Sequence, residues 1–142
     1  MSNSVDEYTD FILPHSRARW DLGNGGFVGY RTVARNPTCG DEVHLGVTID
    51  PQRNTLVASC ERTGCIISRA AASILCEHLT GQTLDEAIKL TARDMLDLMR
   101  VPLLPRRRQC ALLAWQAWQE LIPQLAEVSR KMTPKWDQSA AS

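Results

Sequence analysis

Residues 36–41 combine donor groups that could hold a metal ion. They read Asn-Pro-Thr-Cys-Gly-Asp and place the thiol of Cys39 two positions before the carboxylate of Asp41. Gly40 has no Cβ, so the backbone can pass close to whatever Cys39 holds. Thiolate and carboxylate donors together suit zinc or iron. The same residues are also typical of a turn between strands, and a lone cysteine is more often a small buried residue, so this segment alone favours the turn.

Two further cysteines occupy positions that favour a thiolate. Cys65 follows Gly64 at the start of a predicted helix, where unpaired amides and the helix dipole stabilise an anion. Cys110 lies about one turn into another predicted helix, directly after three arginines at 106–108 whose charges would stabilise its thiolate. Either cysteine could equally be a buried small residue. The spacings between Cys39, Cys65 and Cys110, 26 and 45 residues, match no local metal motif.

The remaining two cysteines are predicted to fill the core. Cys60 continues the buried parity of its strand, and Cys76 lies in the middle of a helix rich in alanine, isoleucine and leucine. We therefore leave both out of the predicted site. Trp115 and Trp118 are expected to anchor the core rather than to bind a ligand.

Length and composition predict one globular domain spanning residues 1–142, with loose tails at 1–7 and 133–142. The chain has 142 residues, 44% hydrophobic and 23% charged. Sixteen basic and sixteen acidic residues balance, which excludes the broad positive field of a nucleic-acid binder. No segment approaches the length needed to span a membrane, and the N-terminus has no apolar export signal. We expect a cytoplasmic protein whose five cysteines serve metal binding, sulfur chemistry or packing.

Hydrophobic periodicity predicts an α+β fold. A short helix over residues 8–15 precedes three strands, and the short connection after the second strand makes the second and third antiparallel. Three helices follow, with a capping box at 83–86 and a possible interruption of the last helix at Pro123. These elements make a three-stranded antiparallel sheet packed on one face by a layer of helices. The strands are expected at residues 27–34, 43–49 and 55–61, and the helices at 65–79, 84–99 and from 106 onward.

Three blocks of sequence together resemble the iron-sulfur cluster assembly scaffold family of IscU, SufU and NifU N-terminal domains. They are the Asn-Pro-Thr-Cys-Gly-Asp segment at 36–41, Gly-Cys-Ile-Ile-Ser-Arg-Ala-Ala-Ala-Ser at 64–73 and Arg-Gln-Cys-Ala-Leu-Leu-Ala-Trp at 108–115. The resemblance runs from about residue 8 to residue 122 and implies the same sheet-plus-helices fold. It also implies one site for zinc or a nascent cluster, formed by Cys39, Asp41, Cys65 and Cys110.

The resemblance implies a scaffold rather than an enzyme. A cysteine desulfurase would deliver persulfide sulfur to Cys39 or Cys110, iron would join, and a transient [2Fe-2S] cluster would pass to apo acceptor proteins. The alternative is a SufU-like zinc-dependent sulfur-transfer protein in which Cys39 accepts the persulfide. A third possibility is a structural zinc domain that docks partners without chemistry. We expect no nucleic-acid or membrane partner and a monomer or weak homodimer.

Several positions depart from the family pattern. Gln109 stands where the IscU branch has a histidine, and the 45-residue gap between Cys65 and Cys110 lacks the insertion of the SufU branch. Arg62 and Cys60 replace a usual glycine and phenylalanine ahead of the second cysteine. Residues 104–107 only partly resemble the Leu-Pro-Pro-Val-Lys segment that an Hsp70-type chaperone recognises in the IscU branch. Residues 110–115 are similar instead to the SufU branch, so the chain lies between the two branches.

Overall fold

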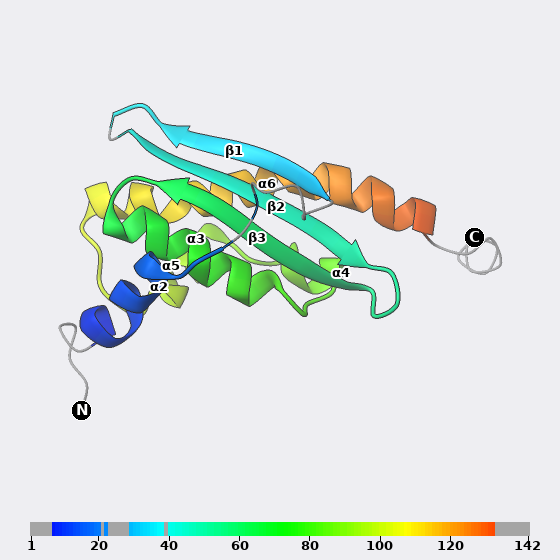
Figure 1. Ribbon diagram of the computed structural model, residues 1–142, viewed down its shortest axis with the longest axis horizontal. Coiled ribbons are helices and arrows are strands. Elements are labelled where there is room, and N and C mark those ends of the chain that lie inside the picture. The colour runs from blue at the N-terminus through cyan, green and yellow to red at the C-terminus, as the bar shows by residue number, and fades with distance from the viewer. Residues whose placement is uncertain (1–6, 21, 23–28, 39, 133–142) are drawn as a thin grey trace.

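The computed structural model describes residues 7–20, 22, 29–38 and 40–132, which form one antiparallel sheet backed by helices (Figure 1). The sheet has the order β1-β2-β3, and both neighbouring pairs are antiparallel. Its strands are β1 (Tyr30–Asn36), β2 (Asp41–Asp50) and β3 (Thr55–Thr63). The helices are the π-helix η1 (Tyr8–Ile12), α2 (Leu13–Arg17), α3 (Ile66–Leu79), α4 (Leu84–Ala87), α5 (Ala92–Leu98) and α6 (Pro105–Met132).

The period-2 pattern of the second predicted strand is confirmed in β2. The four alternating aliphatic side chains from Val43 to Ile49 are all buried, whereas Glu42, His44 and Thr48 are only partly covered. β2 begins at Asp41, which pairs with Asn36 at the end of β1. The metal-binding segment predicted at 36–41 therefore connects the first two strands of the sheet. Residues 27 and 28 of the first predicted strand lie outside the described residues.

The layer of helices covers one face of the sheet, as predicted (Figure 1). α3 packs against β3, α6 packs against β1 and β2, and the two long helices also pack against each other. Trp118 of α6 is fully buried, as are Cys60 of β3 and Cys76 of α3. The prediction that both cysteines fill the core is confirmed. Trp115 is partly buried, and its indole N–H donates to the Leu90 carbonyl at 2.9 Å.

The single helix predicted at 84–99 is wrong, because the structure divides it into α4 and α5. Thr83 and Glu86 form the predicted capping box at the start of α4. A second capping box follows at Thr91, whose side chain accepts from the Asp94 N–H while the Asp94 carboxylate accepts from the Thr91 N–H. Because Thr91 is extended at ψ 168°, the helix ends before it and begins again after it.

The interruption expected at Pro123 is also absent, since α6 runs through it. Proline removes one backbone donor from the helix interior, which costs about 3 kcal/mol in an isolated helix. Leu121 and Leu125 on either side are fully buried, so packing of α6 on the sheet offsets this cost.

The ends of the chain are only partly described. Residues 1–6 and 133–142 of the expected loose tails lie outside the described residues, whereas Glu7 is the N-cap of η1. Among the described residues, no helix combines the length and the apolar character needed to cross a bilayer.

Candidate metal centre

Asp41 places a buried carboxylate at the first position of β2. Asp41 is only 2% exposed, and its Oδ1 accepts the backbone N–H of Cys65 at 2.9 Å. Within the described part of the chain no arginine, lysine or histidine pairs with this carboxylate. Buried carboxylates are normally paired with a cation or coordinate a metal. Asp41 therefore has the environment of a ligand rather than of a turn residue.

Gly64 allows this carboxylate to approach the backbone. Its φ of +128° is disfavoured for side-chain-bearing residues, and a Cβ at this position would lie 2.1 Å from Asp41 Oδ1. Gly40 differs, because a Cβ there would have nothing within 4 Å among the described atoms. Its φ of +72° still favours glycine. Gly64 therefore allows a close approach of backbone and carboxylate, and Gly40 serves the turn. The approach expected between the Gly40 backbone and a group held by Cys39 involves a residue outside the described part of the chain.

Cys65 is the N-cap of α3, as predicted from its position after Gly64. Its sulfur accepts the backbone N–H of Ser68 at 3.4 Å, and its thiol lies 3.6 Å from Asp41 Oδ2. Ser68 is buried, and its hydroxyl donates to the Cys65 carbonyl at 3.1 Å. These bonds hold the sulfur at the end of the helix where a negative charge is favoured.

Cys110 reaches the same place from the second turn of α6. It is 1% exposed, and burial, followed by contact with Cys65 and then with Asp41, raises the pKa of its thiol to about 12. The expectation that the arginines at 106–108 would stabilise its thiolate is wrong. Their side chains are exposed, and the Cys110 thiol donates instead to the Arg106 carbonyl at 3.7 Å. Metal binding would therefore have to release the Cys110 proton.

Three of the four predicted site residues converge. One ligand atom from each of Asp41, Cys65 and Cys110 lies within 4.8 Å of the others, although the residues come from β2, the start of α3 and α6. Two sulfurs bound to a tetrahedral zinc at about 2.3 Å would lie about 3.8 Å apart. The spacing thus fits a metal ion after small side-chain movements. Cys39, the fourth predicted residue, lies outside the described residues.

Sequence reasoning missed the supporting roles of two residues, Ser68 and Gly64. Ser68 could have been found from helix-capping rules, because it stands at the third position after an N-cap at Cys65. The contact between Gly64 and Asp41 has no local sequence signal, since it depends on how β2 and β3 align. The register places Thr63 opposite Glu42. Gly64, which follows Thr63, therefore lies beside Asp41, which precedes Glu42.

The fold and the site define a small α+β protein with a mixed thiol and carboxylate centre. Residues 20–131 match the family described as the NifU-like N terminal domain. This match covers most of the 142-residue chain, and the chain belongs to that family.

Named relatives carry two kinds of description. The iron-sulfur cluster assembly scaffold protein IscU of Thermotoga maritima is 26% identical over 84% of this chain and 94% of its own length. The zinc-dependent sulfurtransferase SufU of Bacillus subtilis is 31% identical over 58% of this chain and 67% of its own length. Relatives from Drosophila melanogaster, Oryza sativa and Arabidopsis thaliana match over only 51%, 61% and 57% of their lengths.

Solved structures agree with the fold. The FiSufU protein of thermophilic Fervidobacterium islandicum AW-1, described as a cluster assembly scaffold protein for the SUF system, superposes with a TM-score of 0.68. It shares 25% sequence identity, and the match covers 84% of this chain and 99% of that one. The predicted fold class and family resemblance are both confirmed.

Proposed function

We propose that this protein is a scaffold on which a [2Fe-2S] cluster is assembled and then released to apo acceptor proteins. The observation that carries the proposal is the convergence of Asp41, Cys65 and Cys110 from three separate elements. Cys39, two positions before Asp41, would supply the fourth ligand. A cysteine desulfurase would supply the sulfur, as the resemblance to IscU implies. The scaffold itself would catalyse no reaction.

Asp41 would make the cluster releasable. Iron-sulfur clusters are normally held by thiolates, and a carboxylate oxygen is a harder donor that holds them less firmly. The carboxylate also accepts the Cys65 N–H, which keeps it directed toward the site even before loading. Cys65 and Cys110 would hold the cluster, and Asp41 would be the ligand that yields first.

Replacing Asp41 therefore tests the proposal. In Asp41→Ala, a cluster assembled anaerobically should persist longer under a chelator challenge, because the remaining ligands are thiolates. The loss of the visible cluster absorbance gives the rate. Asp50→Ala, which removes a carboxylate at the other end of β2, is the matched control and should lose its cluster at the wild-type rate. Equal rates in all three proteins would remove the proposed role of Asp41.

A zinc-dependent sulfur-transfer function is the second candidate, favoured by the similarity to SufU of Bacillus subtilis. The two thiols and one carboxylate that converge in this chain also suit zinc. Anaerobic reconstitution with iron, cysteine and a desulfurase separates the two functions. A visible chromophore with two irons per site supports the scaffold. A colourless protein that retains zinc and accelerates desulfurase turnover supports sulfur transfer instead.

The burial of Cys110 argues against it as the sulfur acceptor. A persulfide from a partner enzyme must approach the acceptor sulfur directly, and Cys110 is 1% exposed. We infer that Cys39 is the acceptor. Mass spectrometry after one desulfurase turnover should find one added sulfur atom on Cys39, with labelling lost in Cys39→Ser and kept in Cys110→Ser. The opposite pattern would assign the role to Cys110.

A further inference from the structure

A second concave site lies beside the metal centre. A cavity of about 690 Å³ is bordered by the segment that follows α2, by β2 and β3, and by the first turn of α3. Neither Asp41, Cys65 nor Cys110 lines it. Its charged lining comes mainly from Arg17, Arg19, Arg62, Arg69, Glu42 and Glu61. The four arginines outnumber the two glutamates, so the side chains that line the cavity carry a net positive charge.

The carboxylates in the cavity do not neutralise the arginines. Glu42 already pairs with Arg35 at 3.1 Å and contacts the His44 ring at 2.7 Å. In the described parts of the chain, Arg17, Arg19 and Arg69 make no salt bridge. Guanidinium groups that share a cavity without carboxylate partners repel one another, and an anion between them would relieve that repulsion.

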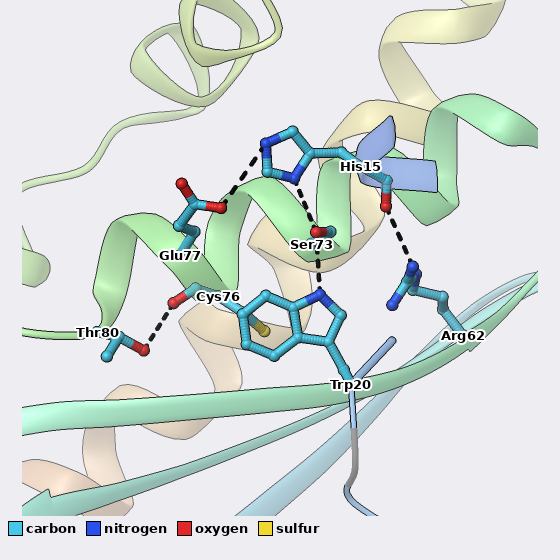
Figure 2. A network of polar contacts seen from close by, with 7 residues as sticks. All are labelled: His15, Trp20, Arg62, Ser73, Cys76, Glu77 and Thr80. Carbon is cyan, nitrogen blue, oxygen red and sulfur yellow. Dashed lines mark hydrogen bonds and ion pairs between the residues drawn. The ribbon is translucent and has the colours of Figure 1, made fainter. Parts of the chain in front are cut away.

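Two of these arginines also carry an unsatisfied buried donor. The Nε atoms of Arg62 and Arg69 are both buried and have no hydrogen-bond partner among the described residues. Arg62 cannot easily turn to expose its Nε, because its Nη2 donates to the carbonyls of His15 and Ser16 at 3.1 and 3.3 Å (Figure 2 shows the first of these bonds). Buried donors in folded proteins almost always have a partner, so the unpaired Nε–H groups of two arginines that line the same cavity favour an acceptor near them.

We propose that this cavity binds a small multivalent oxyanion, either phosphate or a di- or tricarboxylate, between Arg62 and Arg69. Such anions present several acceptor oxygens, and guanidinium groups bind them through parallel, charge-assisted hydrogen bonds. Arg17 and Arg19 are exposed at the rim and add positive charge at the entrance. This site is separate from the metal centre, and its existence does not depend on the proposed scaffold function.

Titration of the full chain with inorganic phosphate tests the proposal. Nitrogen-15-labelled protein is titrated by NMR at constant ionic strength, with the Nε–H signals of Arg62 and Arg69 and the indole signal of Trp20, which also lines the cavity, as reporters. We expect saturable shifts in these signals, and competition by citrate for the same site. Arg69→Gln should weaken binding about tenfold or more, as expected for the loss of a charge-assisted hydrogen bond.

Two variants make the result decisive. Arg53→Gln removes an exposed arginine from the turn between β2 and β3, outside the cavity, and should bind phosphate as the wild type does. Arg19→Gln, also exposed, should weaken binding to a smaller extent and replaces Arg69→Gln if that variant fails to fold. Non-saturable shifts, equal displacement by chloride, or wild-type affinity in the folded cavity variants would each overturn the proposal.

Discussion

At Gly64 the protein has no room for even one extra carbon atom. An added Cβ would lie 2.1 Å from Asp41 Oδ1 and 2.9 Å from its Cα, so the clash involves both the carboxylate and backbone. Substitution here must move the first residue of β2 or the start of α3. Because both elements supply donors to the candidate metal centre, a change at a residue that binds nothing would alter the site.

We predict that Gly64→Ala lowers stability and abolishes tight metal binding. Backbone strain at φ +128° contributes about 1–3 kcal/mol, and displacement of Asp41 adds to it. Urea unfolding gives the free-energy change, and metal analysis of folded protein gives the zinc or iron content. Gly81→Ala is the matched control: its φ of +93° imposes strain but its Cβ meets nothing within 4 Å. It should lose stability while binding metal normally, and equal metal content in both variants would contradict the prediction.

Sequence patterns alone were sufficient to assign two of the five cysteines. Strand parity and mid-helix position assigned Cys60 and Cys76 to the core, where both are fully buried. The electrostatic environment of Cys110 could not be read in the same way. Nearby arginines in the sequence suggested a stabilised thiolate, but a helix places consecutive residues on different faces, and only the packed structure shows that burial dominates.

At the scale of elements, capping decides how the segment from residue 84 to 99 is divided. Its apolar spacing alone is compatible with one long amphipathic helix. Two side-chain caps within nine residues, at Thr83 and Thr91, produce two short helices instead. Periodicity placed Ile88, Met95 and Met99 on one core-facing side. Met95 and Met99 are fully buried, but Ile88 is 43% exposed, because periodicity could not show where the backbone turns.

We predict that Thr91→Ala destabilises the protein by about 1 kcal/mol through loss of the N-cap of α5. Urea unfolding measures the change, and amide hydrogen exchange should accelerate most at Asp94, whose N–H donates to the Thr91 hydroxyl that the substitution removes. Arg93→Ala changes an exposed position of the same helix without touching the cap and should be nearly neutral. If Thr91→Ala were as stable as Arg93→Ala, the capping box would not be what divides the two helices.

At the scale of the whole molecule, the N-terminal helices are attached to the rest through partly buried polar contacts (Figure 2). The Ser73 hydroxyl of α3 contacts the His15 Nδ1 at 2.8 Å and accepts the Trp20 indole N–H at 2.9 Å. Arg62 of β3 donates to carbonyls at the C-terminal end of α2. No sequence rule connects these distant positions, which explains why their roles were not predicted.

This attachment should weaken in acid. Burial lowers the pKa of His15 below its ordinary value of 6.5, with smaller contributions from Arg100 and Arg62, while the Glu77 carboxylate opposes the shift. In the unfolded chain the imidazole takes up its proton near pH 6.5, whereas the native protein resists protonation until lower pH. The contribution of neutral His15 to the free energy of unfolding is therefore fully present above about pH 6.5, and it is lost as the pH falls from there through the lower pKa of the native protein.

Urea unfolding across this pH range checks the sign. His15→Asn should show a shallower loss of stability on acidification than the wild type, because the titrating group is gone. Glu77→Gln should act in the opposite direction and steepen the loss slightly, since it removes the charge that favours protonated His15. Identical pH profiles for wild type and His15→Asn would show that another group controls the response.

The whole fold was the most predictable feature. Alternation in β2, short turns and the apolar faces of α3 and α6 each indicate the same sheet with helices on one face, so local signals and tertiary packing agree. The site was less predictable from the residues alone, because its donors belong to segments far apart in the chain. Three blocks resembling one family supplied the missing connection, and the structure then brought Asp41, Cys65 and Cys110 together.

The three donors lie far apart in the sequence, so protein synthesis delivers them at different times. A ribosome delivers Asp41 and Cys65 long before Cys110, and the last donor becomes available only when α6 has emerged and docked on the sheet. A nascent chain therefore offers incomplete coordination until nearly all of its core is in place. Tight metal binding would thus require a completely folded chain, and truncated or misfolded chains would not bind the metal.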